Sequence, residues 1–299
     1  MASKKVAFIG CVESSYVALR ELISCSQYIE VVAVITKKTS GCNADFKDLS
    51  PLVKNSNIPV LYIEDEPEEA RQVEWLRIMA VDIVFCVGWS RLLGREMLRL
   101  APDGVVGYHP AELPANRGRH PIVWALALGL DQTASSFFLM DEHADSGPIL
   151  HQEVIAIAPG EAAFTLYEKL LNVIPRQIRA IAKGLEYGTF KAVQQNHDLA
   201  NCWRKRGIED GRIDWRMSAE DIDRLVRALS VPYPGSHFEH SGADVKQWRC
   251  AVVENATRNM EPGKVIEVDG RVLTVKCGPN ALRLIEHGLG TIPVPGDCL

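Results

Sequence analysis

Residues 82–109 read DIVFCVGWSRLLGREMLRLAPDGVVGYH, and this stretch decides the fold. An almost wholly apolar run (82–88) is followed by a helical pattern that ends at Pro102 and by a second apolar run (104–109). Strands that are apolar throughout are typical of the centre of a parallel sheet, where helices cover both faces. A strand, a helix and a strand in this order predict a parallel β–α–β unit.

The same alternation extends in both directions along the chain. Before this stretch we expect strands at KKVAFIG, VVAVIT and VLYI, with helices over 13–24 and 64–79. After it we expect a helix at PIVWALALGL, strands at ASSFFLMD and ILHQEVIAI, and a long amphipathic helix over 160–184. The sequence therefore predicts an α/β protein with a doubly wound, mainly parallel sheet, in which ligands bind beyond the carboxyl ends of the strands.

The C-terminal part of the chain follows a different pattern. Between 191 and 211 the sequence loses its period and turns polar, so we expect a linker there. A helix then begins at Ser218 with Asp221 three residues later, a capping pair, and short strands separated by Pro and Gly follow. We expect a catalytic domain over 1–190 and a small β-barrel, OB-like domain over 212–299.

Composition narrows the class of partner. The 299 residues carry 33 basic and 38 acidic side chains, a net charge of −5, whereas nucleic-acid-binding proteins usually carry a basic surplus. We therefore expect a small-molecule substrate rather than a nucleic acid. The eight cysteines form no C-x-x-C pair, which favours reduced thiols. Without a signal-peptide core or an apolar run of about 18 residues, the sequence favours a cytoplasmic protein with no membrane span.

His109 ends a buried strand at the edge where ligands bind, and Asp145 follows the next sheet strand 36 residues later. Two adjacent strand ends would bring the imidazole and the carboxylate together. Such a pair is suited to acyl transfer, because an oriented histidine moves protons or stabilises an oxyanion. A purely structural hydrogen bond is the alternative. The spacings of His109, His120 and His143 match no metal-ligand pattern, so we expect no metal.

Six residues near this pair carry a resemblance to a known family: His109, Pro114, Arg117, Gly118, Asp145 and Gly147. They match Asn-x-His-x-x-x-x-Pro, Arg-Gly and Asp-x-Gly, the pattern of the folate-dependent N-formyltransferases. That family, which the chain resembles, includes methionyl-tRNA formyltransferase and the sugar-nucleotide N-formyltransferases. Ile213-Asp214-Trp215 and Pro232-Tyr233-Pro234-Gly235 resemble the opening of the family's C-terminal domain.

The resemblance implies formyl transfer from 10-formyltetrahydrofolate to an amine through a tetrahedral intermediate. It assigns His109 to that intermediate, and it assigns Asp145 to the orientation of His109 and to the proton of the amine. It places the folate between two walls, whose residues are Val87, Gly88 and Trp89 on one side and Asp141, Glu142, His143 and Ala144 on the other. Trp89 either stacks on a folate ring or packs in the core.

The chain departs from the family at the asparagine that stands two residues before the histidine, because this position is Gly107. Loss of an oxyanion donor of this kind costs roughly 10²–10³ in rate. Gly107 and His109 should face the same side of the strand, with Tyr108 on the other side. We expect the side chain of Asn116 to supply the missing donor, with His120 as the alternative.

Charge indicates the class of acceptor. The segment TKKTSGCNADFKDLSP is short and balanced in charge, whereas transfer-RNA binding needs several cations together. The resemblance then favours a nucleotide-linked amino sugar, bound by Tyr108, Pro110, Arg117 and Arg119. Methionyl-tRNA formyl transfer, formylfolate hydrolysis and folate binding by a site that has lost catalysis are the alternatives. A homodimer is compatible with the resemblance.

Overall fold

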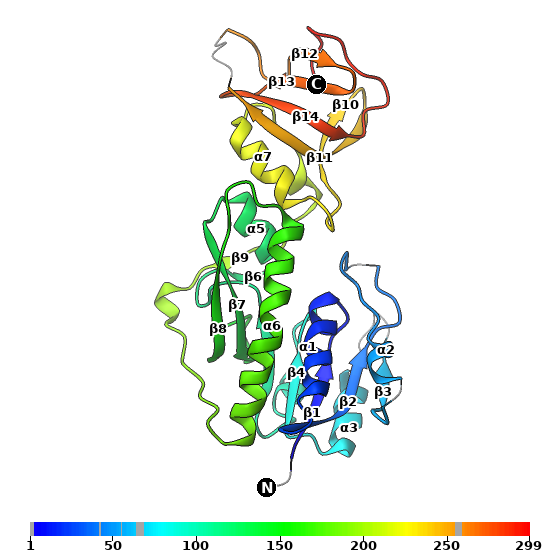
Figure 1. The fold of residues 1–299 in the computed structure, drawn as a ribbon, viewed down its shortest axis with the longest axis vertical. Helices are drawn as coiled ribbons and strands as arrows, with labels where there is room; N and C mark the ends of the chain where they lie inside the picture. The colour runs from blue at the N-terminus through cyan, green and yellow to red at the C-terminus, as the bar shows by residue number, and fades with distance from the viewer. Residues whose placement is uncertain (1–2, 42, 55, 64–68, 255–258) are drawn as a thin grey trace. The chain divides into compact units, whose positions relative to one another are not determined.

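A computed structural model describes the chain except for residues 1–2, 42, 55, 64–68 and 255–258. The chain divides into two compact units (Figure 1). The first unit comprises Met1–Pro121, Thr133–Ile155 and Glu168–Trp203, and the second comprises Ile122–Gln132, Ala156–Tyr167 and Arg204–Leu299.

A seven-stranded sheet forms the centre of the first unit, in the order β3-β2-β1-β4-β5-β7-β8 (Figure 1). Strands β1 to β5 are parallel, whereas β7 runs antiparallel to β5. The predicted mainly parallel sheet is therefore confirmed. Its strands are β1 (Lys4–Ile9), β2 (Ile29–Thr36), β3 (Val60–Tyr62), β4 (Ile83–Cys86), β5 (Val105–His109), β7 (Gln132–Leu139) and β8 (Ile149–Ala156).

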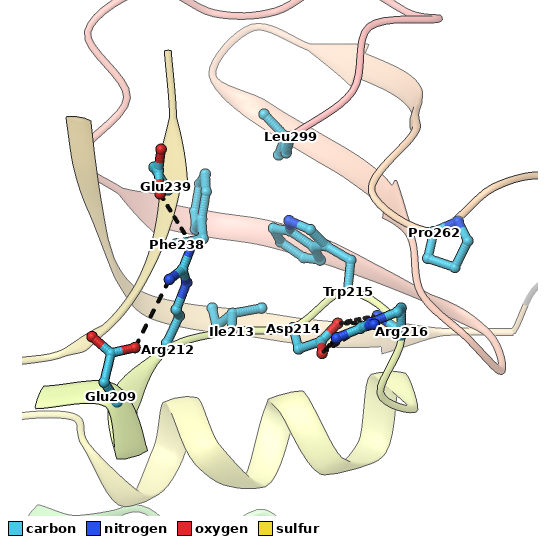
Figure 2. A pocket seen from close by; sticks show the side chains of 10 residues that line it. All are labelled: Glu209, Arg212, Ile213, Asp214, Trp215, Arg216, Phe238, Glu239, Pro262 and Leu299. Carbon is cyan, nitrogen blue, oxygen red and sulfur yellow. Dashed lines mark hydrogen bonds and ion pairs between the residues drawn. The ribbon is translucent and has the colours of Figure 1, made fainter. Parts of the chain in front are cut away.

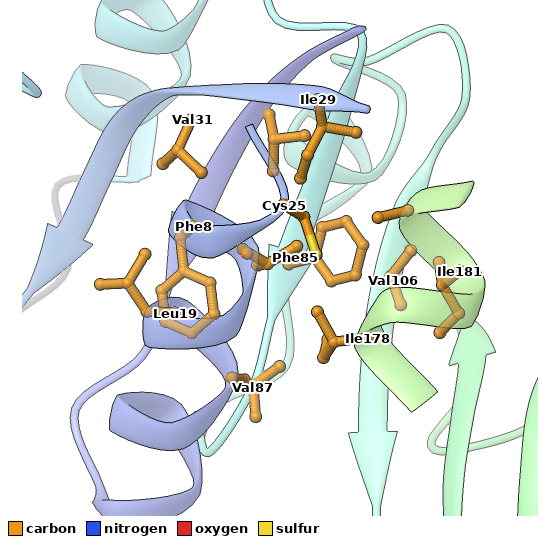
Figure 3. Packing of buried hydrophobic residues seen from close by; sticks show 14 of the residues in the cluster. Phe8, Leu19, Cys25, Ile29, Val31, Phe85, Val87, Val106, Ile178 and Ile181 are labelled. Atoms are coloured by element: carbon orange, nitrogen blue, oxygen red, sulfur yellow. The ribbon is translucent and has the colours of Figure 1, made fainter. Parts of the chain in front are cut away.

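Helices cover both faces of this sheet, as a doubly wound fold requires. Helices α1 (Glu13–Ser24) and α6 (Ala163–Glu186) pack on one face together with the short α2 (Ser50–Val53). Helices α3 (Glu69–Met79) and α4 (Arg95–Leu98) pack on the other face. Figure 3 shows the first core, in which side chains of the strands meet those of α1 and α6. Each large apolar side chain buried there contributes about 1.5–3 kcal/mol, so the central strands hold the loops at their ends in place.

The predicted helices of the first unit differ from the observed ones mainly at their ends. Helix α1 has the bounds predicted over 13–24. Helix α4 is shorter than the helical pattern that ends at Pro102, and the N–H of Gly94, just before the helix, donates to the carboxylate of Glu69. Helix α3 begins at Glu69, and the earlier part of its predicted range, 64–68, lies outside the described residues.

The second unit contains a five-stranded antiparallel sheet in the order β10-β11-β14-β13-β12. The predicted strands of the C-terminal part are all present, and β10 is an additional one. Ser218 caps α7 (Ala219–Ala228) as predicted, because its hydroxyl accepts from the N–H of Asp221 at 3.0 Å. The unit comprises α5 (Pro121–Ala127), α7, β10 (Ser236–His240), β11 (Ala243–Val253), β12 (Val265–Asp269), β13 (Val272–Lys276) and β14 (Ala281–His287).

The segment predicted to be a linker, 191–211, contains regular secondary structure. Strand β9 (Cys202–Trp203) within it pairs in parallel with β6 (Arg117–Gly118). The segment also holds two 3₁₀ helices, His197–Leu199 and Ile208–Gly211. Residues up to Trp203 therefore belong to the first unit. The domain boundaries drawn from the sequence remain a proposal.

Among the helices that the structure describes, none has the length and apolar character needed to cross a membrane.

Candidate active site

His109 is the last residue of β5, and only 5% of it is exposed. Its Nε2 atom lies 2.8 Å from the backbone oxygen of Asn116. Its Nδ1 atom lies 3.6 Å from Oδ2 of Asp145. The structure thus brings together the two residues that the sequence singled out for catalysis, and it adds a backbone carbonyl to the other side of the imidazole.

Asp145 reaches His109 by a route different from the predicted one. Because β7 is antiparallel to β5, Leu139 at its end pairs with Val106, near the start of β5. The prediction that two adjacent strand ends meet at one edge is therefore wrong, and the loop over 140–148 has to fold back along the sheet. Asp145 adopts a φ of 53°, in the left-handed region that is uncommon for residues other than glycine.

Two groups hold Asp145 in this conformation. The N–H of Gly118 donates to Oδ2 of Asp145 at 2.9 Å. The Nε2 of Gln195 donates to the backbone oxygen of Asp145 at 2.9 Å and to that of Gly147 at 2.6 Å. The carboxylate is therefore fixed both by its own hydrogen bond and through its main chain.

Gly118 is a position that admits no side chain. Its φ is 103°, and a Cβ there would lie 2.2 Å from the backbone oxygen of Trp203. This close approach exists because β9 pairs with β6 at Gly118. The glycine of the Arg-Gly motif thus allows two segments far apart in sequence to join beside Asp145.

The two arginines predicted to bind substrate have different surroundings. Arg117 donates from Nη2 to Oε1 of Gln195 at 2.6 Å and contacts Nδ1 of His197 at 3.1 Å. Its guanidinium is therefore partly engaged within the protein, and its predicted contact with substrate stays a prediction. Arg119 is exposed and donates from Nη1 to the backbone oxygen of Ser90 at 2.8 Å. It remains accessible at the strand ends.

Gln195 and Asn201 are site residues that the sequence analysis missed. Only 6% of Gln195 is exposed, and Oδ1 of Asn201 accepts from the N–H of Asn116 at 2.7 Å. The only signal was the run QQNHDLAN, which is rich in amides and has no helix or strand period. Amide side chains in such a segment suit the capping of backbone groups, because each carries both donors and an acceptor. The sequence does not indicate which backbone groups they cap.

Gly107 leaves no room for the asparagine of the family pattern. A Cβ at this position would lie 2.8 Å from Cγ of Met140 and 2.9 Å from Cζ of Phe138. Phe138 is the direct partner of Gly107 across the strands, so the two residues share one face of the sheet. Two apolar side chains therefore fill the space into which a larger residue would project.

Asn116 meets His109 through its main chain, not its side chain. The residue is half-buried with a φ of 64°, and its amide has no hydrogen-bond partner among the residues that the structure describes. The role of oxyanion donor predicted for this side chain stays a prediction. His120, the alternative donor, also has a positive φ, of 57°.

Tyr108 is the predicted substrate contact that the structure places away from His109. It projects from the opposite face of β5, where its ring centroid lies 4.9 Å from that of Phe137. Its hydroxyl accepts from Oγ of Ser135, and burial raises its pKa. Because side chains alternate along a strand, the Tyr108 side chain lies on the other face of the sheet from His109, and its predicted contact with substrate stays a prediction. Pro110 directly follows His109, and its carbonyl accepts from Oγ1 of Thr133 at 3.2 Å.

In the first predicted wall of the folate site, the backbone groups of Val87 form hydrogen bonds within the protein. Val87 is fully buried, its N–H donates to Ile9, and its carbonyl accepts from Oγ of Ser15 at 2.6 Å. Both backbone groups of Val87 therefore have partners within the protein, and its predicted place in the folate wall stays a prediction. Gly88, with a φ of 67°, and the half-buried Trp89 continue the wall towards solvent. Trp89 packs against the core that includes α3 and α4.

The second predicted wall is an exposed turn over 141–144. Oδ1 of Asp141 accepts from the N–H of His143 at 2.9 Å. Glu142 forms a two-point ion pair with Arg95 at 2.8 Å, and this pair lowers the pKa of Glu142. Arg95 is the first residue of α4 and follows Trp89 of the first wall by six positions. The ion pair therefore links the turn of the second wall to the chain segment just after the first wall. The two predicted walls are thus neighbours.

Residues 4–179 match the formyl transferase family, and residues 207–291 match the formyl transferase C-terminal domain. The chain belongs to the formyl transferase family. The matched ranges contain His109, Asp145 and the walls described above, whereas Gln195 lies between them.

Solved structures of low sequence identity share the fold of this chain. An N-formyltransferase from Helicobacter canadensis, in complex with folinic acid and dTDP-3-aminofucose, matches with a TM-score of 0.71 and 16% identity over 94% of this chain and 98% of its own. WlaRD, a sugar 3N-formyl transferase, matches with a TM-score of 0.69 and 13% sequence identity over 95% of this chain and 98% of its own. HypX from Aquifex aeolicus matches with a TM-score of 0.66 and 16% sequence identity over 95% of this chain. This chain spans only 44% of HypX.

Two cavities formed by described residues of the second unit have no predicted site residue in their lining. Figure 2 shows the larger, of about 580 Å³, in which Arg212 pairs with Glu239 and Arg216 with Asp214 beside Trp215. The smaller, of about 370 Å³, is lined in part by α7. Within the described residues, no cluster of three or more His, Cys, Asp and Glu side chains is arranged to hold a metal ion.

Proposed function

We propose that this formyl transferase moves the formyl group of 10-formyltetrahydrofolate to a primary amine, and that the acceptor is a nucleotide-linked amino sugar. The observation that carries the proposal is the contact between His109 and Asp145, which occurs in a chain that matches the family over residues 4–179. The folate is a co-substrate, and no metal takes part in the proposed reaction.

The hydrogen bonds of His109 indicate how the pair handles protons. A proton on Nε2 satisfies the Asn116 carbonyl, and the lone pair of Nδ1 then faces Asp145. The imidazole and the carboxylate form two acceptors side by side. An amine that donates to them is oriented towards the formyl carbon and loses a proton as the new C–N bond forms. The proton passes to N10 of the folate as the old C–N bond breaks, and tetrahydrofolate leaves.

The oxyanion of the tetrahedral intermediate needs a donor other than residue 107. In the proposal, the half-buried amide of Asn116 supplies it, since the carbonyl of the same residue already lies 2.8 Å from His109. A neutral amide in such a place would take over the function of the family's asparagine.

Asn116→Gly tests this donor, because glycine removes the amide and keeps the positive φ. We expect kcat to fall by about 10²–10³-fold, with the folate dissociation constant unchanged. Steady-state assays of formyl transfer measure the first quantity and calorimetry the second. Asn280→Gly, at another asparagine with positive φ, is the matched control. An unchanged kcat in the Asn116 variant would discard the substitute donor.

The class of acceptor rests on similarity and on charge. Two of the similar structures are sugar formyltransferases or contain dTDP-3-aminofucose. Arg119 stands exposed at the strand ends, where a guanidinium suits a phosphate. The chain lacks the basic surplus that a transfer-RNA substrate favours. A cytoplasmic location and a homodimer complete the proposal, and light scattering in solution tests the dimer.

The first experiment is calorimetric titration of the protein with 5-formyltetrahydrofolate, which needs no knowledge of the acceptor. We expect one site per chain with a dissociation constant in the micromolar range. Arg95→Met should weaken binding slightly by releasing the turn over 141–144 from α4, whereas Arg77→Met, at another exposed arginine in an ion pair, should not. Absence of binding at high ligand concentration would overturn the proposed folate chemistry.

A second candidate function is folate binding without formyl transfer. The observation in its favour is the closed space at Gly107, where Met140 and Phe138 leave no room for the family's asparagine. Formyl transfer to amino-sugar nucleotides, followed by mass spectrometry of the products, separates the two functions. Folate binding together with inactivity towards all acceptors supports the second candidate.

A further inference from the structure

We propose that Gln195 is a positioning residue for Asp145, which makes the segment after α6 part of the catalytic apparatus. The inference rests on the proposed function of the His109–Asp145 pair. Gln195 lies outside both ranges that match the family domains, 4–179 and 207–291. Its side-chain hydrogen bonds go to Asp145, Gly147 and Arg117, so we expect its effect on the reaction to pass through Asp145.

Every polar atom of the Gln195 amide is used. Its two N–H groups donate to the backbone oxygens of Asp145 and Gly147, at 2.9 and 2.6 Å. Its oxygen accepts from Nε and Nη2 of Arg117, at 3.2 and 2.6 Å. A buried amide with all its hydrogen bonds made holds its partners in one arrangement, because loss of any partner leaves an unsatisfied polar group.

These bonds close a ring around the carboxylate. Gln195 binds the main chain of Asp145 on one side and the side chain of Arg117 on the other. Arg117 precedes Gly118, whose N–H donates to the Asp145 carboxylate. The Gln195 amide therefore links the backbone of Asp145, through one hydrogen bond, to Arg117, the neighbour of the Gly118 N–H that donates to the Asp145 carboxylate. This fixes the direction in which Oδ2 faces Nδ1 of His109.

The main chain of Asp145 needs such a support. A residue with a side chain that adopts a φ of 53° keeps that conformation only when its surroundings impose it. Gln195 provides two hydrogen bonds within this turn, one of them to Asp145 itself. Without them we expect the carboxylate to sample other directions, and misplacement by about 1 Å can cost about 10²-fold in rate.

The test uses imidazole ¹⁵N spectra of the whole protein with labelled histidines, in the absence of folate and acceptor. Gln195→Leu removes all four hydrogen bonds at similar volume, and Gln195→Glu keeps an acceptor for Arg117 but removes the two donors. Asp145→Asn supplies the reference spectrum for a His109 without its carboxylate. Gln247→Leu, at a buried glutamine of the second unit that donates to the Arg249 carbonyl, is the control for the loss of a buried amide.

We expect the His109 signals of both Gln195 variants to move towards those of Asp145→Asn, and the control to leave them in place. In formyl-transfer assays, we expect kcat to fall by up to about 10²-fold with KM for the folate unchanged, and Gln195→Leu to cause no further loss when combined with Asp145→Asn. Wild-type His109 signals in a folded Gln195→Glu protein would overturn the inference. Because the spectra need neither ligand, failure of the proposed formyl transfer leaves this result readable.

Discussion

Asp145→Asn is expected to lower kcat for formyl transfer by about 10²–10⁴-fold while the protein stays folded and binds folate as before. The substitution keeps the shape of the side chain and an oxygen for the N–H of Gly118. It removes the charge that faces Nδ1 of His109 at 3.6 Å and with it the acceptor for the proton of the amine. Single-turnover assays with an amino-sugar nucleotide measure the chemical step, and calorimetry with 5-formyltetrahydrofolate measures binding.

Asp82→Asn is the matched control for this prediction. Asp82 directly precedes β4, at the opposite end of the parallel strands from His109, and its Oδ2 likewise accepts from a backbone N–H, that of Lys5, at 2.7 Å. Its replacement should leave kcat nearly unchanged. His109→Ala should also abolish transfer, and the double variant should lose little more than either single one, because the two residues act as a unit. Substantial activity in Asp145→Asn would contradict the mechanism.

Gly118→Ala is expected to have the second large effect, on stability as well as on activity. A methyl group there would lie 2.2 Å from the Trp203 oxygen and 2.8 Å from Sγ of Cys202, at a φ of 103° that alanine rarely adopts. The colliding oxygen is part of the backbone, so β6 and β9 have to separate. We expect the free energy of unfolding to fall by roughly 2–5 kcal/mol, from backbone strain and overpacking together. Urea unfolding measures this change.

Two other glycines separate the causes of the Gly118 effect. Gly188 has a φ of 63°, and a Cβ added there would meet no atom within 4 Å, so Gly188→Ala reports the cost of the conformation alone. Gly41 has open space as well and no positive φ, so Gly41→Ala should change little. If Gly118→Ala is no less stable than Gly188→Ala, the close approach to Trp203 does not constrain the protein. We also expect Gly118→Ala to lose formyl transfer, because its N–H no longer meets Asp145.

Local patterns in the sequence were sufficient for most of the first unit. The bounds of α1 and the buried strands β4 and β5 follow from apolar periodicity, which reflects burial of one helix face or of a whole strand. The opposite orientations of His109 and Tyr108 follow from the alternation of side chains along β5. The capping of α7 by Ser218 was also readable, since its partner Asp221 is only three residues away.

Contacts between distant segments escaped the sequence analysis. The apolar pattern of β7 does not indicate that this strand is antiparallel to β5. Because it is antiparallel, the chain reaches Asp145 from the end of the sheet opposite to the one expected. The pairing of β6 with β9 joins residues about eighty positions apart, and neither two-residue strand carries a periodic signal. Similarly, the packing of Met140 and Phe138 around Gly107 became visible only once both strands were in place.

By itself, the sequence determined the doubly wound sheet and the position of His109 at a strand end. These features depend on burial and on neighbours a few residues apart. Only the tertiary structure decided that Asp145 folds back to His109 and that Gln195 holds it there. It likewise decided that Val87 is fully buried. Such contacts depend on which donors and acceptors meet across long stretches of chain, and hydrogen bonds between distant residues leave no period in the sequence.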